Sequence, residues 1–161
     1  MSKEEICCYE FIPGPWDKEK QTWVEKLFIK SLVPQFLHMP LPGTYGKVIP
    51  KMQAAIEGSN AKVNPKDFLM LTEDLSAWKS NLYINTTKEV PGFDNVKLSG
   101  TFLSMVFDGP YSNIPKYIKE INEYVTNEGE KILKYYFYYT TCPKCAKKYG
   151  HNYIVILAQI E

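Results

Sequence analysis

The chain has 161 residues, of which 45% are hydrophobic, 14% aromatic and 23% charged. This is enough chain to bury a real core, so the first expectation is one globular domain. A net charge of +1, with 19 basic residues that are all lysine, offers no arginine forks for bases or phosphates. The sequence therefore predicts no nucleic-acid partner.

The N-terminal residues lack the basic and long apolar stretches of a signal peptide. The longest apolar run, residues 153–158, is too short to span a bilayer. We therefore expect a cytoplasmic protein without a membrane partner. In that compartment the cysteines are expected as reduced thiols or metal ligands, not as disulfides. They are Cys7, Cys8, Cys142 and Cys145.

The first half of the chain is expected to begin with an N-terminal extension, residues 1–30. Within it, residues 6–12 suit an extended segment, and residues 18–29 suit a short helix or irregular segment. A strand then runs to about residue 41, and a helix follows the Gly43 turn, with Pro50 in its first turn. Two further strands are predicted at residues 67–73 and 81–89.

The second half shows the same order of elements. A strand is predicted over residues 96–107, and an amphipathic helix from Ile114 to a stop at Gly129. Strands over residues 132–141 and 152–160 follow. Between them lies a hairpin loop that contains the sequence CPKC.

Residues 36–48 and 102–114 align at a shift of 66 residues. Within these stretches the identical pairs are Phe36 with Phe102, Leu37 with Leu103, Met39 with Met105, Gly43 with Gly109 and Tyr45 with Tyr111. Such a repeat predicts the architecture. We expect an α+β fold, one domain built from a duplicated βαββ unit with pseudo-two-fold symmetry, with repeats at 31–90 and 96–161. The antiparallel sheet would form a saddle with both helices on one face, leaving a ligand groove at the seam of the repeats.

The turn Gly109-Pro110-Tyr111, followed by an isoleucine-rich amphipathic helix, resembles the GyrI-like small-molecule-binding domain. The first copy reads Gly43-Thr44-Tyr45, and the resemblance covers roughly residues 30–161. That domain is also the effector-binding part of AraC-type and MerR-type multidrug regulators. The resemblance implies a groove with aromatic walls and a buried acidic side chain that binds bulky, planar, often cationic molecules. Some stand-alone members are similar to hydrolases of cyclopropane-bearing DNA alkylators, and this chain has no helix-turn-helix to spare.

Glu73 is the first candidate for the acidic residue. It ends the predicted strand 67–73 on the face of Leu69 and Leu71. Among aromatic side chains, its carboxylate would attract a lipophilic cation or act as a general base. The alternative is a solvated carboxylate in a hairpin loop beside Asp74.

Aromatic residues supply the other ligand-binding candidates. Trp16 and Trp78 could stack on a flat cation or could cap the edge of a core. Tyr45 and Tyr111 occupy equivalent turns, which argues first for structure, although Tyr111 is also the candidate to hydrogen-bond a substrate carbonyl. His38 is expected on the first strand, half-buried and hydrogen-bonded. The remaining ligand-binding candidates lie on predicted strands: Tyr83, Phe102, Tyr136, Tyr138 and Tyr153.

Cys142 and Cys145 have the spacing of a zinc knuckle. A closed structural zinc site needs four ligands, and His151 with Cys7 or Cys8 would have to complete it. A redox pair would be expected at a helix start, which a hairpin does not provide. A plain loop of reduced cysteines is the alternative, and no other cofactor is predicted.

Three functions follow from these residues. The first is binding of bulky, planar, lipophilic and often cationic small molecules, for sequestration of a drug or toxin. The second is a hydrolase of electrophilic planar compounds, which leaves open whether the protein is an enzyme. The third is a zinc-stabilised interaction module.

Overall fold

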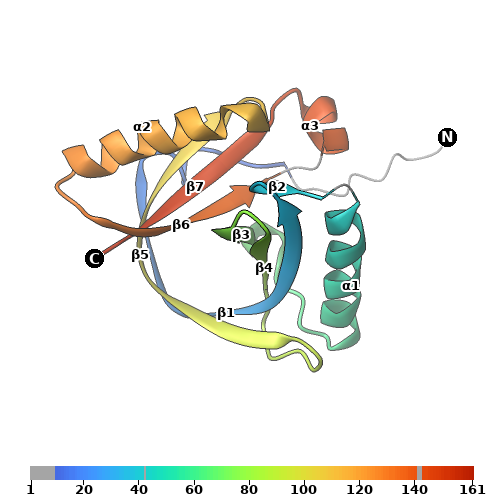
Figure 1. Ribbon diagram of the computed structural model, residues 1–161. Coiled ribbons are helices and arrows are strands. Elements are labelled where there is room, and N and C mark those ends of the chain that lie inside the picture. Colours follow the sequence, from blue (N-terminus) through green and yellow to red (C-terminus); the bar gives the residue numbers. More distant parts are fainter. Residues whose placement is uncertain (1–9, 42, 141–142) are drawn as a thin grey trace. The chain divides into compact units, whose positions relative to one another are not determined.

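The computed structural model describes residues 10–41, 43–140 and 143–161. It confirms an α+β protein with antiparallel strands (Figure 1). Among the described residues, no helix is long and apolar enough to cross a membrane. The elements in chain order are β1 (Glu19–Phe36), β2 (Met39–Pro40), α1 (Thr44–Gly58), η1 (Pro65–Asp67), β3 (Met70–Ser76), β4 (Lys79–Asn85), β5 (Asp94–Asp108), η2 (Tyr111–Asn113), α2 (Ile114–Asn127), β6 (Ile132–Tyr139), α3 (Pro143–Tyr149) and β7 (Tyr153–Ile160).

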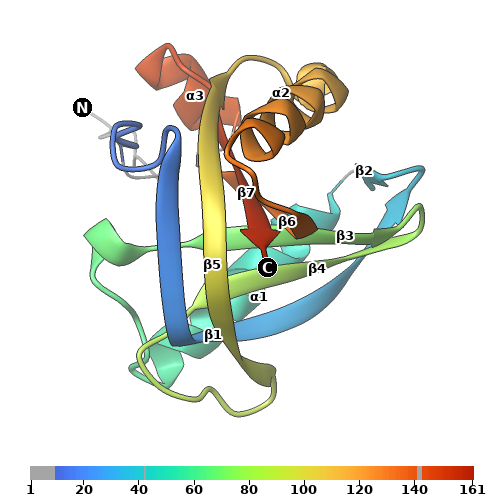
Figure 2. The same ribbon diagram turned by 90° about the vertical axis from the view of Figure 1, so that its left-hand side faces the viewer.

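The chain divides into two compact units. Unit 2 comprises residues 22–100, and unit 1 comprises residues 101–161 with the described residues up to 21. The two long strands β1 and β5 each have residues in both units (Figure 2). Unit 2 contains the helix α1 and unit 1 contains the helices α2 and α3, and each unit is described separately below.

Unit 2 is an antiparallel sheet in the order β2-β1-β4-β3, with α1 packed on one face. Alternate residues of β1 and β4 pack against the apolar side of α1. Side chains alternate between two faces along a strand, whereas in a helix every third or fourth residue lies on the same face. The central contacts of this core are Ile29 and Val33 from β1, Leu82 and Ile84 from β4, and Met52 and Ile56 from α1. The strand residues between these core positions point to the opposite face of the sheet, and they include polar and aromatic side chains.

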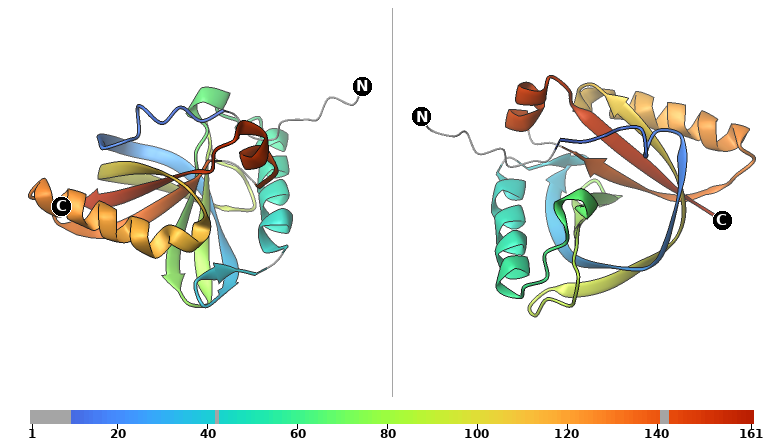
Figure 3. Two further views of the ribbon diagram at one scale, coloured as in Figure 1. Left: turned by 90° about the horizontal axis from the view of Figure 1, so that it is seen from above. Right: turned by 180° about the vertical axis from the view of Figure 1, so that it is seen from behind.

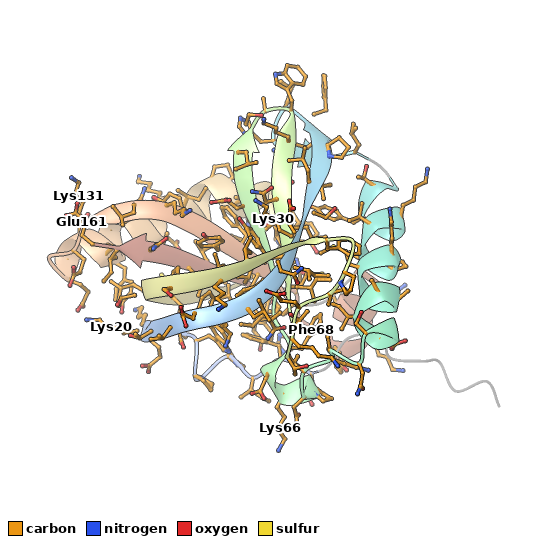
Figure 4. All side chains as sticks on the ribbon, turned by 90° about the horizontal axis from the view of Figure 1, so that it is seen from below. Lys20, Lys30, Lys66, Phe68, Lys131 and Glu161 are labelled. Atoms are coloured by element: carbon orange, nitrogen blue, oxygen red, sulfur yellow. The ribbon has the colours of Figure 1, made fainter. Side chains whose placement is uncertain are left out.

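Unit 1 is an antiparallel sheet in the order β6-β7-β5, and α2 lies along it (Figure 3). Its core combines Leu103 and Phe107 from β5, Phe137 from β6, Ile154 and Ile156 from β7, and Tyr117, Ile121 and Val125 from α2. Lys131 and Glu161 lie together at one end of this sheet, with Nζ and Oε1 3.8 Å apart (Figure 4).

The turn Gly109-Pro110-Tyr111 needs a glycine at its first position because a side chain has no room there. Tyr117 of α2 stacks on Phe107 with ring centroids 4.4 Å apart. Its hydroxyl occupies the place where a Cβ on Gly109 would lie. The turn can therefore bring β5 against α2 only without a side chain at this position.

The prediction for residues 18–29 was wrong, because they belong to the strand β1. The lysine, glutamate and leucine residues of this stretch are good helix formers, but Thr22, Trp23 and Val24 favour a strand. From Phe28 to Pro34 the strand is paired residue by residue with β4, and this tertiary pairing overrides the local preference. The strand ends at Phe36 instead of near residue 41.

The first helix starts earlier than predicted. It begins at Thr44, so Pro50 lies inside the helix and not in its first turn. The second helix, Ile114–Asn127, is confirmed. The strands β5, β6 and β7 lie within two residues of their predicted bounds, whereas β3 is displaced because Pro65–Asp67 forms a 3-10 turn.

The 66-residue alignment does not hold position by position. Phe36 is the last residue of β1 and is 54% exposed, whereas Phe102 lies within β5 and is 1% exposed. The two aligned phenylalanines therefore have different structural environments.

Candidate functional site

Glu73 lies on the face of the unit 2 sheet that turns away from α1. Register explains its neighbours: Glu73 on β3 pairs directly with Asn81 on β4, and Tyr83 is the next residue of β4 on that face. The hydroxyl of Tyr83 donates to Glu73 Oε1 at 2.8 Å, and the Asn81 amide donates to the same oxygen at 3.2 Å. Glu73 is 9% exposed and Tyr83 is 5% exposed, so this is a buried carboxylate held by oriented donors.

Aromatic side chains from β1 pack next to Tyr83, the donor to this carboxylate. Phe28 meets the Tyr83 ring edge-on, with centroids 6.1 Å apart, and Trp23 lies 5.9 Å from Phe28. Glu25, at a positive φ of 48°, interrupts the extended backbone between them. This interruption lets Trp23 and Phe28 meet although they are five positions apart, a spacing that would place them on opposite faces of a regular strand.

Lys30 is the cationic residue of the same face. It pairs directly with Tyr83 across β1 and β4 and is half-buried (Figure 4). We use the name Glu73 face for the side of the unit 2 sheet that carries Phe28, Lys30, Glu73, Asn81 and Tyr83. It combines one buried carboxylate, two hydrogen-bond donors, a ring and a lysine.

The unit 1 sheet also has an aromatic side, which lies away from α2. Tyr136 and Phe102 meet at 5.9 Å, and both are buried. Tyr138 follows on β6, and Tyr153 lies on the same side of β7. We call this set of four residues the aromatic face of unit 1.

The N-terminal segment packs on this aromatic face. Phe11 contacts Tyr138 at 5.9 Å and Tyr153 at 5.7 Å, and Trp16 contacts Tyr138 at 6.0 Å. The buried Ser104 hydroxyl fixes the segment by donating to the Trp16 carbonyl at 2.7 Å. Trp16 therefore joins the tyrosines that the sequence analysis proposed.

Tyr45 and Tyr111 are not brought into these two faces. Tyr45 lies in α1 and packs on the core between α1 and the sheet, where burial raises the pKa of its hydroxyl. Tyr111 lies in η2 and meets Tyr139 at 5.3 Å, and Tyr139 packs against the α2 side of the unit 1 sheet. Both positions suit the structural role that their repetition in the sequence suggested.

Trp78 and His38 lie elsewhere in unit 2. Trp78 is 60% exposed next to the β3–β4 turn and contacts Phe36 at 5.6 Å. His38 is not on the first strand but in the turn before β2, at a positive φ of 65°. It is exposed, not half-buried, and its Nδ1 lies 2.6 Å from Asp74 Oδ2.

The cysteine pair lies partly outside the described residues, because Cys142 is not among them. The loop prediction was wrong for the rest, since Pro143–Tyr149 forms the helix α3 and Cys145 is buried in it. Pro143, Lys144 and Cys145, the described part of the CPKC sequence, therefore lie in the first turn of a helix. Among the described residues, no group of three or more histidine, cysteine or acidic side chains could hold a metal ion.

Sequence reasoning missed Asn81, Phe28 and Phe11 as members of these faces. Asn81 could have been found from the hairpin register, because it stands directly across from Glu73. Phe28 was assigned to a helix, and that error concealed its position. Phe11 reaches Tyr138 through a contact that is distant in sequence and leaves no local pattern.

Comparison with solved structures identifies the same fold in several proteins at low sequence identity. A Listeria innocua hydrolase encoded by lin2189 is 13% identical, covers 92% of this chain and 94% of its own, and has a TM-score of 0.65. The C-terminal domain of EcmrR is 11% identical, with coverages of 91% and 98% and a TM-score of 0.68. SAV2435, solved with tetraphenylphosphonium, is 11% identical, with coverages of 89% and 93% and a TM-score of 0.54.

No curated protein matches the sequence. The sequence is matched by a protein-family model described as a bacterial hydrolase, over residues 1–160. This match spans nearly the whole chain, including both units and the Glu73 face. The chain therefore belongs to the bacterial hydrolase family.

Proposed function

We propose that the protein binds bulky, lipophilic, cationic small molecules and that Glu73 is their counter-ion. The observation that carries this proposal is the buried carboxylate of Glu73, held by the Tyr83 hydroxyl at 2.8 Å beside the ring of Phe28. One neighbour of the same fold supports it: SAV2435, which was solved with the lipophilic cation tetraphenylphosphonium.

A partly dehydrated carboxylate suits an organic cation for an electrostatic reason. Attraction between opposite charges grows as the surroundings become less polar, and a lipophilic cation loses little hydration when it leaves water. Aromatic faces add attraction for delocalised positive charge. Lys30 on the same face opposes this attraction, so its removal should strengthen cation binding.

The test is a titration of rhodamine 6G, a planar lipophilic cation, followed by fluorescence anisotropy. Wild type should bind it with saturation in the micromolar range, and Glu73→Gln should weaken binding at least about tenfold, a loss of about 1.4 kcal/mol. The matched control is Glu89→Gln, which removes the charge of an exposed glutamate in the same unit and should change nothing. Lys30→Met should tighten binding.

Fluorescein, a planar anion of similar size, separates charge recognition from hydrophobic adsorption. It should bind poorly to wild type and better to Glu73→Gln. Equal affinity of wild type and Glu73→Gln for rhodamine 6G would overturn the assignment of Glu73. Absence of saturable rhodamine binding would overturn the proposed function.

The second candidate function is hydrolysis of an electrophilic planar compound, which membership of the bacterial hydrolase family favours. In this reaction Glu73 takes a proton from water while the water oxygen bonds to the electrophilic carbon. The bond from that carbon to its leaving atom breaks, and the proton passes from Glu73 to the leaving atom, which stays attached to the product through the opened ring. A hydrolase would increase the mass of its ligand by one water with turnover, whereas a binder returns it intact. Glu73→Gln would then lower the rate more than the affinity.

The GyrI-like relationship, the duplicated βαββ unit with its saddle and seam groove, and the cytoplasmic location stay predictions. The same holds for Tyr111 as a catalytic residue, for Trp78, His38 and Tyr45 as ligand contacts, and for zinc at Cys142 and Cys145. The ligand proposal depends only on residues within unit 2.

A further inference from the structure

A small pocket in unit 1 contains a histidine that neither proposed function uses. The pocket has a volume of about 190 Å³. Its walls are the N-terminal segment, the end of α3 and the start of β7, and they include Glu10, Phe11, Tyr149, His151 and Tyr153. It is therefore built from three separate stretches of chain around one imidazole.

The imidazole of His151 is held in one orientation from two sides. Its ring stacks on Tyr153, with centroids 4.9 Å apart and planes 15° apart. Its Nδ1 lies 2.7 Å from Asp108 Oδ2. Gly150, at φ 75°, ends α3 with a bond from its N–H to the Ala146 carbonyl at 3.0 Å, and so directs the chain to this position.

Asp108 is itself fixed in place. Its second oxygen, Oδ1, accepts the backbone N–H of Asn152 at 2.9 Å, while the Asn152 amide donates to the Gly109 carbonyl at 2.5 Å. The hydrogen bond from His151 is the main cause that lowers the pKa of Asp108. An ionised carboxylate only accepts hydrogen bonds, so Nδ1 carries a proton, and in the neutral imidazole the lone pair lies on Nε2.

We propose that this pocket is a second hydrolytic centre, in which His151, oriented by Asp108, is the general base for water attack on a small uncharged ester. Phe11 and Tyr153 would contact the planar part of the substrate. Glu10 at the wall disfavours anionic substrates by charge repulsion. The centre is independent of the Glu73 face and of the function proposed for it.

The reaction balances with water as the only co-substrate. His151 Nε2 takes a proton from water as the water oxygen bonds to the acyl carbon. The tetrahedral intermediate collapses, the bond from the acyl carbon to the leaving oxygen breaks, and a carboxylic acid and an alcohol or phenol leave. The proton on His151 then passes to the leaving oxygen or to solvent.

Hydrolysis of 4-nitrophenyl acetate, a small uncharged ester, tests this centre. Wild type should show saturation kinetics, and His151→Gln should lower kcat/KM about 100-fold, the lower range for loss of a general base. The matched control is His38→Gln, because His38 is the other histidine of the chain and is also paired with an aspartate, at 2.6 Å from Asp74, but does not line the pocket. This control should keep wild-type kcat/KM.

Asp108 orients His151 and does not contact the substrate, so its substitution should affect kcat and KM differently. Asp108→Asn should lower kcat with KM unchanged, because the substrate contacts remain while the imidazole loses its acceptor. Glu10→Gln should improve hydrolysis of the anionic ester 4-nitrophenyl succinate relative to the acetate. Each variant is accompanied by an unfolding curve that shows a folded protein.

The outcomes distinguish three explanations of ester hydrolysis: a catalytic centre at His151, the reactivity of any surface imidazole, and a reaction at the Glu73 face. Equal losses in His151→Gln and His38→Gln, or a rate without saturation, would overturn the proposal, because any surface imidazole would then suffice. Loss of ester hydrolysis in Glu73→Gln would overturn the independence of the two sites. Normal rhodamine binding by His151→Gln, with lost ester hydrolysis, is the expected result.

Discussion

The Tyr83 hydroxyl donates to the buried carboxylate of Glu73 and accepts from the Asn81 amide at 3.4 Å, and it can be removed without changing the shape of the ring. Tyr83→Phe takes from Glu73 a donor at 2.8 Å. Hydrogen bonds to charged groups contribute more than neutral ones, so we expect the free energy of unfolding to fall by about 1.5–3 kcal/mol. Urea unfolding followed by circular dichroism measures this change.

Tyr124→Phe is the control for that substitution. Tyr124 is a partly buried tyrosine of α2, and no hydrogen bond of its hydroxyl is found among the described residues. Its loss should change the free energy of unfolding by less than about 0.5 kcal/mol. A Tyr83→Phe variant as stable as wild type would show that the bond to Glu73 contributes no net stability, and the view of Glu73 as a carboxylate stabilised by oriented donors would be wrong.

At the scale of elements, a prediction succeeded where the local sequence pattern favoured the same structure as the tertiary contacts, and it failed where the two favoured different structures. The helix α2 was predictable because its apolar residues fall on one face and Pro115 stands at its start. The strand β1 was not, because its lysines and glutamates favour a helix and only its pairing with β4 fixes it as a strand. Glu73 was expected at the end of its strand but lies in the middle of β3, because the strand runs on to Ser76. Its partner Asn81 could be found only from the register of the hairpin.

The position of Pro50 within its helix was predicted incorrectly. It lies inside α1, where proline removes one backbone hydrogen bond and its ring crowds the preceding turn. The side chain is exposed, so Pro50→Ala loses little packing. We expect this substitution to raise the free energy of unfolding by about 1–3 kcal/mol, measured by urea unfolding.

Pro115→Ala is the matched control, because Pro115 stands in the first turn of α2, where the missing N–H costs little. It should leave stability within about 0.5 kcal/mol of wild type. If Pro50→Ala instead destabilised the protein, the fixed φ of proline would have to stabilise α1 by more than the lost bond costs.

At the scale of the whole molecule, the chain connects its two cores through shared strands. Each unit has its own hydrophobic cluster, around Ile121 in unit 1 and around Met52 in unit 2. The strands β1 and β5 each contribute residues to both units. Unfolding of one unit should therefore disrupt strands on which the other unit depends, so we expect a single cooperative transition.

Trp16 in unit 1 and Trp78 in unit 2 can report on the two units separately once Trp23, the third tryptophan of the chain, is replaced by phenylalanine. In backgrounds that retain only one of them, Ile121→Ala should lower stability by about 2–5 kcal/mol, the usual cost of a cavity in a core. Because the transition is shared, the urea midpoint seen by Trp78 should fall as far as that seen by Trp16, although Ile121 lies in unit 1. Met52→Ala, in unit 2, should lower the urea midpoint seen by Trp16 as far as that seen by Trp78. A substitution that moved only the reporter of its own unit would show two units that unfold independently, and the long strands would then be connections without energetic coupling.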